Sequence, residues 1–348
     1  MWTFTVVTDR FLSHCPSGTT LVSFSKSLRV SMLSIDDLLV ARDYSSVSDR
    51  AVRYALDLAA RAGATLHVLY ADVLHEADSD GRRDRSPAGD LATFREELKE
   101  RGTVSAEALD AVSVTEEVRR DVSPGPAILS YAAEADVDLI ALGTHGRRGP
   151  SRILLGSVAE EVVRRANRPV LTVRGEEGDH PAPSPEAIER ILVPVDFSDF
   201  SREALRAAKE WASLYDATID TLHVIAEALH PAYYVGGVES IFDMHPDIEE
   251  TVLERLDTFV AETDGPGVEV RSHVRVGNAA PDIVEFVDEE GIDLVTMSTH
   301  GRTGLDRFLL GSVAEKIVRH VRCPVVTMKA FGRSLMVSEA STGSAAQG

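Results

Sequence analysis

Two similar segments, 143–163 and 298–318, hold the residues best suited to chemistry. Aligned without gaps over 143–172 and 298–327, the chain is identical at 18 of 30 positions. The residues that recur at matching spacing are Gly143, Gly146, Gly156 and Ser157 in the first copy, and Ser298, Gly301, Gly311 and Ser312 in the second. Glycines let backbone N–H groups approach a phosphate closely, and a helix that begins at the serine adds its unbonded amides and positive dipole end. The repeated pattern therefore predicts two nucleotide-phosphate sites.

A purely structural interpretation of the two serines stays open. Residues 157–160 and 312–315 both have the S-x-x-E pattern of a capping box, in which the serine is the helix N-cap. Such a cap contributes about 1 kcal/mol of stability with no ligand present. It does not account for Gly146 and Gly301, ten residues before the last glycine of each segment. The spacing as a whole favours phosphate binding.

The duplication extends over most of the chain. Residues 38–59 (LLVARDYSSVSDRAVRYALDLA) correspond to 191–212 (ILVPVDFSDFSREALRAAKEWA) at an offset of 153. Each copy is about as long as one independently folding domain. We therefore expect an N-terminal extension at 1–31, repeat 1 at 32–174, a Gly-, Pro- and acid-rich linker at 175–189, repeat 2 at 190–330, and a tail at 331–348.

Within each repeat, short apolar runs alternate with helical apolar stripes. Strands buried on both faces and separated by helices indicate a doubly wound α/β domain with a parallel sheet. In each copy, the helix that follows the third strand-like stretch is expected to open at Pro126 or Pro281. Ligands of such sheets bind at the carboxyl ends of the strands, and Asp43 and Asp196 close the first strand of each copy.

With an aspartate after the first strand and G-x2-G-x9-G-S after the fourth, the chain resembles the universal stress protein family, as a tandem member, over 36–330. The resemblance implies two five-stranded parallel sheets of the adenine-nucleotide-binding, Rossmann-like kind, with ATP or AMP as ligand and Mg²⁺ as an optional companion. It assigns the adenine to Asp43 and Asp196 and to the backbone at Ala71 and Val224. Leu142 and Met297 would line the pocket. Ribose and phosphates would contact Gly143, Gly146, Gly156, Ser157, Val158, Ser298, Gly301, Gly311, Ser312 and Val313.

Two positions depart from the family pattern. Ser298 replaces the first glycine in repeat 2, and Ala71 stands where a larger aliphatic residue is usual. If the loop needs positive φ at Gly143, serine at the equivalent point costs on the order of 1 kcal/mol. We therefore expect the first repeat to bind nucleotide more tightly, although Ala71 offers adenine less apolar contact than Val224.

Three classes of function are compatible with these residues. The resemblance supports a stress-related regulatory protein that changes conformation or partner with bound nucleotide. A slow ATP hydrolase or an adenylate-transferring enzyme is the second class, but the segments lack the lysine of a Walker loop and we expect no catalytic residues. A nucleotide-free dimerisation module is the third, and it leaves the glycine spacing unexplained. We expect no metal centre.

The final strands of the repeats predict how the two domains assemble. Residues 168–174 (RPVLTVR) and 323–329 (CPVVTMK) would expose an apolar sheet edge, which proteins pair or cover. In the resembled family this strand serves dimer contacts, so we expect an intrachain pseudo-dimer. A homodimer through other faces stays open, and no protein partner is indicated.

Composition suggests the surroundings of the protein. Asp and Glu total 56 against 36 Lys and Arg, a formal charge of −20, which suits a halophilic cytoplasm or an acidic high-GC proteome. The absence of a basic face argues against nucleic acid, and no apolar run is long enough for a membrane helix. With two cysteines, Cys15 and Cys323, we expect a reducing, cytoplasmic compartment. Residues 1–31 carry a net charge of +2, and we expect translation to begin at Met32 instead.

Overall fold

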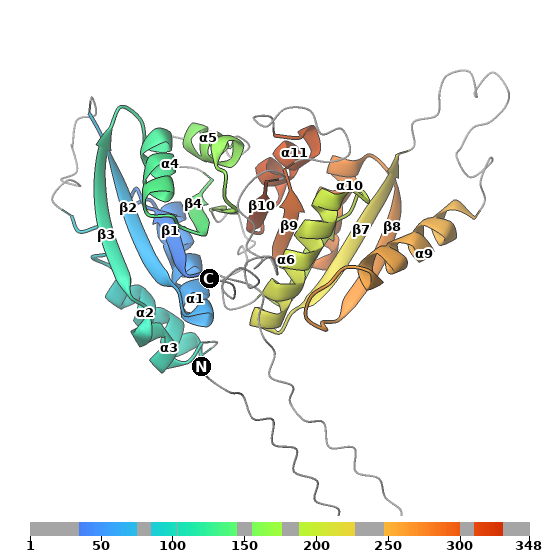
Figure 1. Ribbon diagram of the computed structural model, residues 1–348, viewed down its shortest axis with the longest axis horizontal. Helices are drawn as coiled ribbons and strands as arrows, with labels where there is room; N and C mark the ends of the chain where they lie inside the picture. Colours follow the sequence, from blue (N-terminus) through green and yellow to red (C-terminus); the bar gives the residue numbers. More distant parts are fainter. Residues whose placement is uncertain are drawn as a thin grey trace, which may run out of the picture. The chain divides into compact units, whose positions relative to one another are not determined.

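The computed structural model describes residues 35–74, 85–102, 104–144, 155–175, 188–226, 247–299 and 310–329 (Figure 1). Several predictions from the sequence fall outside these residues. They concern Gly146, Gly301, the extension at 1–31, the tail at 331–348 and all but the ends of the linker. None of the described helices is long and apolar enough to cross a bilayer.

Strands and helices alternate in both repeats. Repeat 1 contains β1 (Asp37–Ala41), α1 (Ser46–Ala62), β2 (Thr65–Val73), α2 (Leu91–Arg101), α3 (Ala106–Ala111), β3 (Val114–Asp121), α4 (Pro124–Glu134), β4 (Leu139–Gly143), α5 (Ser157–Arg165) and β5 (Val170–Val173). Repeat 2 contains β6 (Arg190–Pro194), α6 (Asp199–Tyr215), β7 (Thr218–Ala226), α9 (Ile248–Ala261), β8 (Val270–Gly277), α10 (Ala279–Glu290), β9 (Leu294–Ser298), α11 (Ser312–His320) and β10 (Val325–Met328). The predicted α/β class is confirmed.

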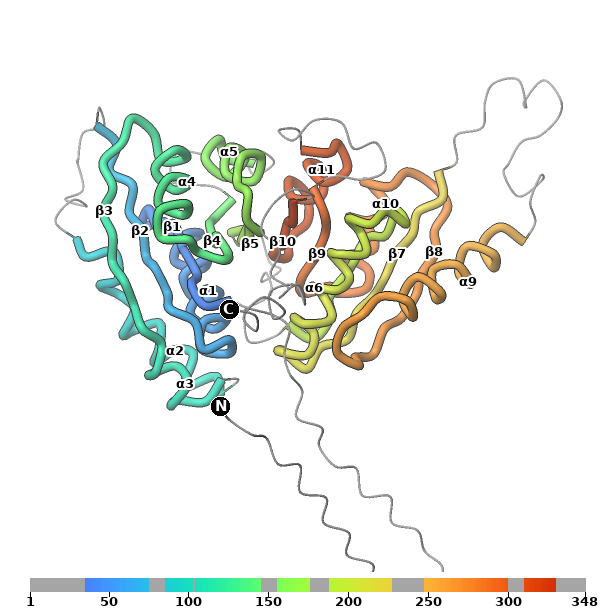
Figure 2. The backbone as a smooth tube through the Cα atoms, viewed as in Figure 1, coloured from blue at the N-terminus to red at the C-terminus, as the bar shows by residue number. Residues whose placement is uncertain are grey.

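The strands form one ten-stranded sheet in the order β3-β2-β1-β4-β5-β10-β9-β6-β7-β8. Within each repeat all described strand pairings are parallel. Figure 2 shows β2 and β3 running side by side, in agreement with their pairing. The winding reverses between β1 and β4, and between β6 and β9, which is where sheets of this kind bind ligands.

The two repeats join through their last strands, as expected. β5 and β10 pair antiparallel, with Leu171 opposite Val326. The Thr172 hydroxyl donates to the carbonyl of Val325 at 3.2 Å, and the Thr327 hydroxyl donates to that of Val170 at 3.3 Å. These reciprocal bonds repeat one arrangement on both sides of the junction, so the chain is a pseudo-dimer of two homologous halves.

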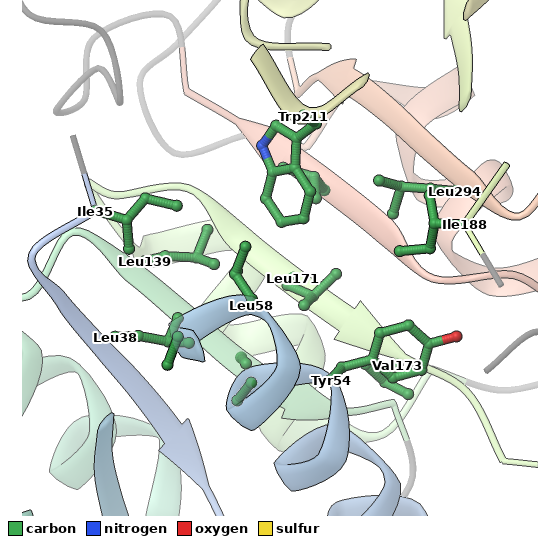
Figure 3. Packing of buried hydrophobic residues seen from close by; sticks show 14 of the residues in the cluster. Ile35, Leu38, Tyr54, Leu58, Leu139, Leu171, Val173, Ile188, Trp211 and Leu294 are labelled. Carbon is green, nitrogen blue, oxygen red and sulfur yellow. The ribbon is translucent and has the colours of Figure 1, made fainter. Parts of the chain in front are cut away.

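Both faces of the sheet are buried because alternate strand residues point to opposite sides. In β1, Leu38 and Val40 pack in the cluster that contains α1, whereas Leu39 belongs to the cluster that contains α4. The first cluster is shared by the two repeats, since Leu171 of β5 and Trp211 of α6 are both members (Figure 3). The two repeats therefore contribute to one continuous apolar cluster.

The helix starts differ slightly from the sequence prediction. α4 begins at Pro124 and α10 at Ala279, each two residues before the proline that was expected to open the helix. Proline is tolerated throughout the first helical turn, because the amide it lacks has no partner within the helix. Pro126 and Pro281 thus lie in the first turn of their helices but are not the first helical residues.

Candidate functional site

A carboxylate-centred turn follows the first strand of each repeat. The Asp43 Oδ1 atom accepts a hydrogen bond from the backbone N–H of Ser45 at 3.0 Å. In repeat 2, Asp196 Oδ1 accepts from the Ser198 N–H at 3.0 Å and from its hydroxyl at 2.5 Å. Each turn places its aspartate at the carboxyl end of the strand, immediately before the next helix.

The residue after each aspartate has an uncommon backbone conformation. Tyr44 has φ 61° and Phe197 has φ 63°, both in the left-handed region that bulky side chains rarely adopt. Such strain persists where surrounding contacts over-determine it, and it concentrates at functional sites. Its occurrence at equivalent positions in both repeats indicates that holding the aspartate in place requires this turn.

Serines at the start of α1 and α6 supply the contacts that hold the turns. The Ser45 hydroxyl caps α1 by accepting from the Ser48 N–H at 3.2 Å, and the Ser48 hydroxyl donates back to the Ser45 carbonyl at 2.9 Å. Ser198 and Ser201 make the same pair of bonds in α6. The Ser48 hydroxyl also accepts from the Asp43 N–H at 3.2 Å, so the aspartate is tied to the helix by its backbone as well.

Aromatic and cationic side chains surround the residue after the aspartate. The Tyr44 and Tyr70 ring centroids lie 5.3 Å apart, and the corresponding Phe197 and His223 rings lie 4.5 Å apart. A guanidinium covers each ring, from Arg85 at 4.4 Å in repeat 1 and from Arg255 at 4.2 Å in repeat 2. Sequence reasoning missed this cluster, although the aromatic residue directly after each aspartate was a visible signal.

The two repeats differ in the residue before the aspartate. Arg42 is buried and pairs with Asp49 at 2.8 Å and with Asp90, whereas its counterpart Val195 lies in the apolar core. Arg42 also donates to the carbonyl of Pro87 at 2.8 Å, which fastens the chain before α2 to the start of α1. Burial works against the charge on Arg42, but the hydrogen bonds that it donates to Asp49 and Asp90 raise its pKa.

In each repeat, backbone hydrogen bonds join the two described ends of the glycine segment, which is 143–157 in repeat 1 and 298–312 in repeat 2. In repeat 1 the Gly156 N–H donates to the Thr144 carbonyl at 2.7 Å, and in repeat 2 the Gly311 N–H donates to the Thr299 carbonyl at 2.9 Å. A Cβ on Gly311 would lie 3.0 Å from that carbonyl oxygen. A side chain at this position would therefore make a tight contact with the backbone at Thr299.

The capping-box interpretation of the serines is wrong. The N-caps of α5 and α11 are Gly156 and Gly311, and neither helix has a side-chain cap bond. Ser157 and Ser312 are instead the first helical residues, and both are exposed. The first helical bond of α5 runs from the Glu160 N–H to the Gly156 carbonyl at 2.9 Å, so the amides before it lie outside the helical ladder.

The backbone argument for a tighter first site is also wrong. Neither Gly143 nor Ser298 is among the described residues with positive φ. Gly143 is constrained by space, since a Cβ there would lie 2.9 Å from Val47 Cγ1 and 3.3 Å from the Ser48 amide nitrogen. The glycine thus lets the end of β4 contact the first turn of α1.

Strand register brings the remaining predicted residues of repeat 1 to the same edge. Ala41 of β1 lies between Leu69 of β2 and Leu142 of β4, and Ala71 is two residues beyond Leu69. Ala71 is half-buried and Leu142 is buried. Asp43, Ala71, Leu142 and Gly143 therefore share the carboxyl edge where the winding reverses.

Repeat 2 has the same arrangement. Pro194 of β6 lies opposite Leu222 of β7, and Val224 is two residues further along. Val224 is half-buried, while Met297 is buried near the end of β9. Val158 and Val313 are half-buried in the first turns of α5 and α11. Each repeat thus offers an anchored carboxylate and an uncapped helix start at one edge of the sheet.

This fold and edge define a class, the tandem doubly wound α/β proteins. A family model described as the universal stress protein family matches residues 34–174 and again 187–329. The chain belongs to the universal stress protein family and contains two of its domains in tandem. Binding of adenine nucleotides is common in that family.

Individual relatives agree with the family assignment. A universal stress protein of Methanocaldococcus jannaschii is 33% identical over 144 residues, covering 40% of this chain and 82% of its own. One from Mycolicibacterium smegmatis is 26% identical over 308 residues, covering 84% of this chain and 96% of its own. The crystal structure of a universal stress protein from Archaeoglobus fulgidus has a TM-score of 0.55 at 21% identity, over 84% of this chain and 98% of that one, which supports the fold.

Proposed function

We propose that the chain binds one adenine nucleotide in each repeat and acts as a regulatory protein whose conformation or partners depend on the bound nucleotide. The observation that carries this proposal is the uncapped start of α5 and of α11, next to a carboxylate held at the same sheet edge. Family membership makes an adenine nucleotide the natural ligand.

The residues at each helix start fit a phosphate group. Among the described residues no side chain caps α5 or α11, whose N-caps are glycines, and α2, α4, α9 and α10 likewise lack a side-chain cap bond. Their exposed serines, Ser157 and Ser312, add a hydroxyl donor at the first helical position. A bound phosphate would accept these hydrogen bonds and complement the helix dipole. We therefore assign phosphate binding to the turns that begin at Gly156 and Gly311, with Val158 and Val313 in them.

The aspartates suit the other end of the ligand. A carboxylate accepts hydrogen bonds only, and the exocyclic amine of adenine is a donor. Oδ1 of Asp43 and of Asp196 holds the turn, which fixes the orientation of the carboxylate group. We assign adenine selection to these aspartates and to the backbone at Ala71 and Val224.

Turnover is expected to be slow or absent. The described residues contain no cluster of side chains suited to a metal ion, and residues 143–157 lack the lysine of a Walker loop. The chemistry offered at this edge is binding, with amide and hydroxyl donors for phosphate and a carboxylate for the base. We propose that the nucleotide acts as a regulatory ligand.

The test is a calorimetric titration of the whole chain with ATP, AMP and GTP, with and without Mg²⁺, at low and high salt. We expect ATP or AMP to bind and GTP to bind at least tenfold more weakly. In the double variant Asp43→Asn and Asp196→Asn, the amide oxygen preserves the turn while the added amide group opposes adenine, so this preference should be lost.

Asp199→Asn is the matched control, because Asp199 is exposed at the start of α6 and should leave binding unchanged. No binding of any adenine nucleotide would overturn the proposal. Hydrolysis by the pure protein at several turnovers per second would overturn the regulatory role in favour of an ATPase.

A further inference from the structure

The residues that directly follow β5 and β10 are cations that reach the opposite repeat. Arg174 of repeat 1 donates from Nη1 to the carbonyls of Arg319 at 2.8 Å and Val321 at 3.3 Å. Lys329 of repeat 2 donates from Nζ to the carbonyl of Arg164. These carbonyls belong to the last turns of α11 and α5 and to the residue that ends α11. Each repeat thus holds the C-terminus of a helix in the other.

The residue just before each cation holds the glycine segment of its own repeat. The Thr144 N–H donates to the Val173 carbonyl at 2.8 Å, and Thr144 in turn accepts from Gly156 at the start of α5. In repeat 2 the Thr299 N–H donates to the Met328 carbonyl at 2.8 Å, and Thr299 accepts from Gly311. The end of β5 therefore fixes the start of α5 through backbone bonds and the end of α11 through the Arg174 side chain. The end of β10 likewise fixes the start of α11 and, through Lys329, the end of α5.

The two helices are short enough for this double attachment to set their direction. α5 and α11 have nine residues each, which is about 14 Å of helix at 1.5 Å per residue. A cation at the C-terminus satisfies unbonded carbonyls and complements the helix dipole. Arg174 is buried, and its bond to the Val321 carbonyl is shielded from solvent competition, whereas the half-buried Lys329 makes its bond at an exposed position.

We propose that Arg174 and Lys329 are positioning residues for nucleotide binding in the opposite repeat, Arg174 acting on the site at α11 and Lys329 on the site at α5. This inference rests on the function proposed above. The amides at a helix start bind phosphate well only when the helix axis is fixed beforehand. Without its C-terminal anchor, each helix pivots about its start, and the amides lose their alignment with the phosphate. Each site is then complete only in the presence of the other repeat.

The test isolates one site at a time. Gly156→Val blocks the site of repeat 1 and leaves that of repeat 2, and Gly311→Val does the reverse. In the Gly156→Val protein, Arg174→Gln should weaken ATP binding about 3- to 10-fold, while Lys329→Gln should change it less than twofold. In the Gly311→Val protein the two effects should exchange. Arg174→Lys keeps a donor cation and should restore part of the affinity.

This crossed pattern separates positioning from general destabilisation. Equal weakening of both sites by either variant, or an effect confined to the variant's own repeat, would overturn the inference. Hydrogen exchange on the nucleotide-free protein is the second readout. Lys329→Gln should speed amide exchange in 156–165 and leave 311–320 unchanged, and Arg174→Gln should do the opposite. If wild-type protein fails to bind ATP, the proposed function falls, and the exchange data still decide whether the cations position the helices.

Discussion

At the scale of single residues, the site depends on close backbone approaches. Gly143 lies against the first turn of α1, where a Cβ would meet Val47 and the Ser48 amide. Its counterpart Ser298 already carries a Cβ, so the first turn of α6 accommodates one. The distinction between the two positions is therefore a matter of local space around the strand end.

A pair of substitutions tests this contact. Gly143→Ala should lower the free energy of unfolding by about 1–3 kcal/mol, because the added methyl group overpacks a backbone contact that cannot shift freely. Ser298→Ala keeps the Cβ and should cost less than half as much. Denaturant unfolding of both variants measures the difference. Equal losses would show that the space at Gly143 does not determine its identity.

At the scale of elements, a polar cluster joins neighbouring strands in each repeat. The charged and histidine side chains occupy different strands in the two repeats. In repeat 1, His67 of β2 contacts Asp37 of β1 at 2.9 Å and the Tyr131 hydroxyl of α4 at 2.8 Å. In repeat 2, Asp220 of β7 accepts from Arg190 of β6 at 3.0 Å and contacts His273 of β8 at 2.8 Å. The carboxylate is on β1 in repeat 1 and on β7, the middle of three strands, in repeat 2, yet each cluster joins three elements.

The cluster in repeat 2 predicts a pH dependence of stability. Burial alone would raise the pKa of Asp220, but hydrogen bonds from His273 and Arg190 outweigh it and lower that pKa below its ordinary 3.8. A lowered pKa in the folded state contributes stability above pH 3.8, and this contribution is lost as pH falls through the folded value. Asp220→Asn should cost about 1–3 kcal/mol at pH 6, and its difference from wild type should shrink below pH 3.8.

Denaturant unfolding between pH 6 and pH 3 measures this difference. Asp264→Asn is the control, because the Asp264 side chain is 84% exposed and its ion pair with Arg206 is long, at 3.7 Å. It should change the unfolding free energy little at any pH. A gap between Asp220→Asn and wild type that stays constant down to pH 3 would contradict the assignment.

Sequence patterns predicted elements well and contacts between distant segments poorly. Apolar runs located the strands, and the apolar character of 168–174 and 323–329 predicted the β5–β10 junction, because these signals are local. The S-x-x-E pattern misled, since it does not distinguish a serine at the N-cap from one at the first helical position when a glycine precedes it. The bonds from Arg174 and Lys329 join residues about 150 positions apart, and no local pattern encodes them.

At the scale of the whole molecule, duplication has produced two similar edges on one continuous sheet. The two halves share one apolar cluster that includes Leu171 and Trp211. The assigned nucleotide residues, including Gly146 and Gly301 outside the described residues, stay a prediction, as do the halophilic, cytoplasmic setting and the domain limits. Two binding sites per chain are the proposal drawn from this duplication.

Native mass spectrometry of the whole chain with excess ATP tests this central claim most directly. The account predicts two bound nucleotides per wild-type chain, one in each of Gly156→Val and Gly311→Val, and none in the double variant, because bulk at either position blocks the uncapped helix start. A wild-type chain that binds no nucleotide, or a double variant that still binds two, would contradict it.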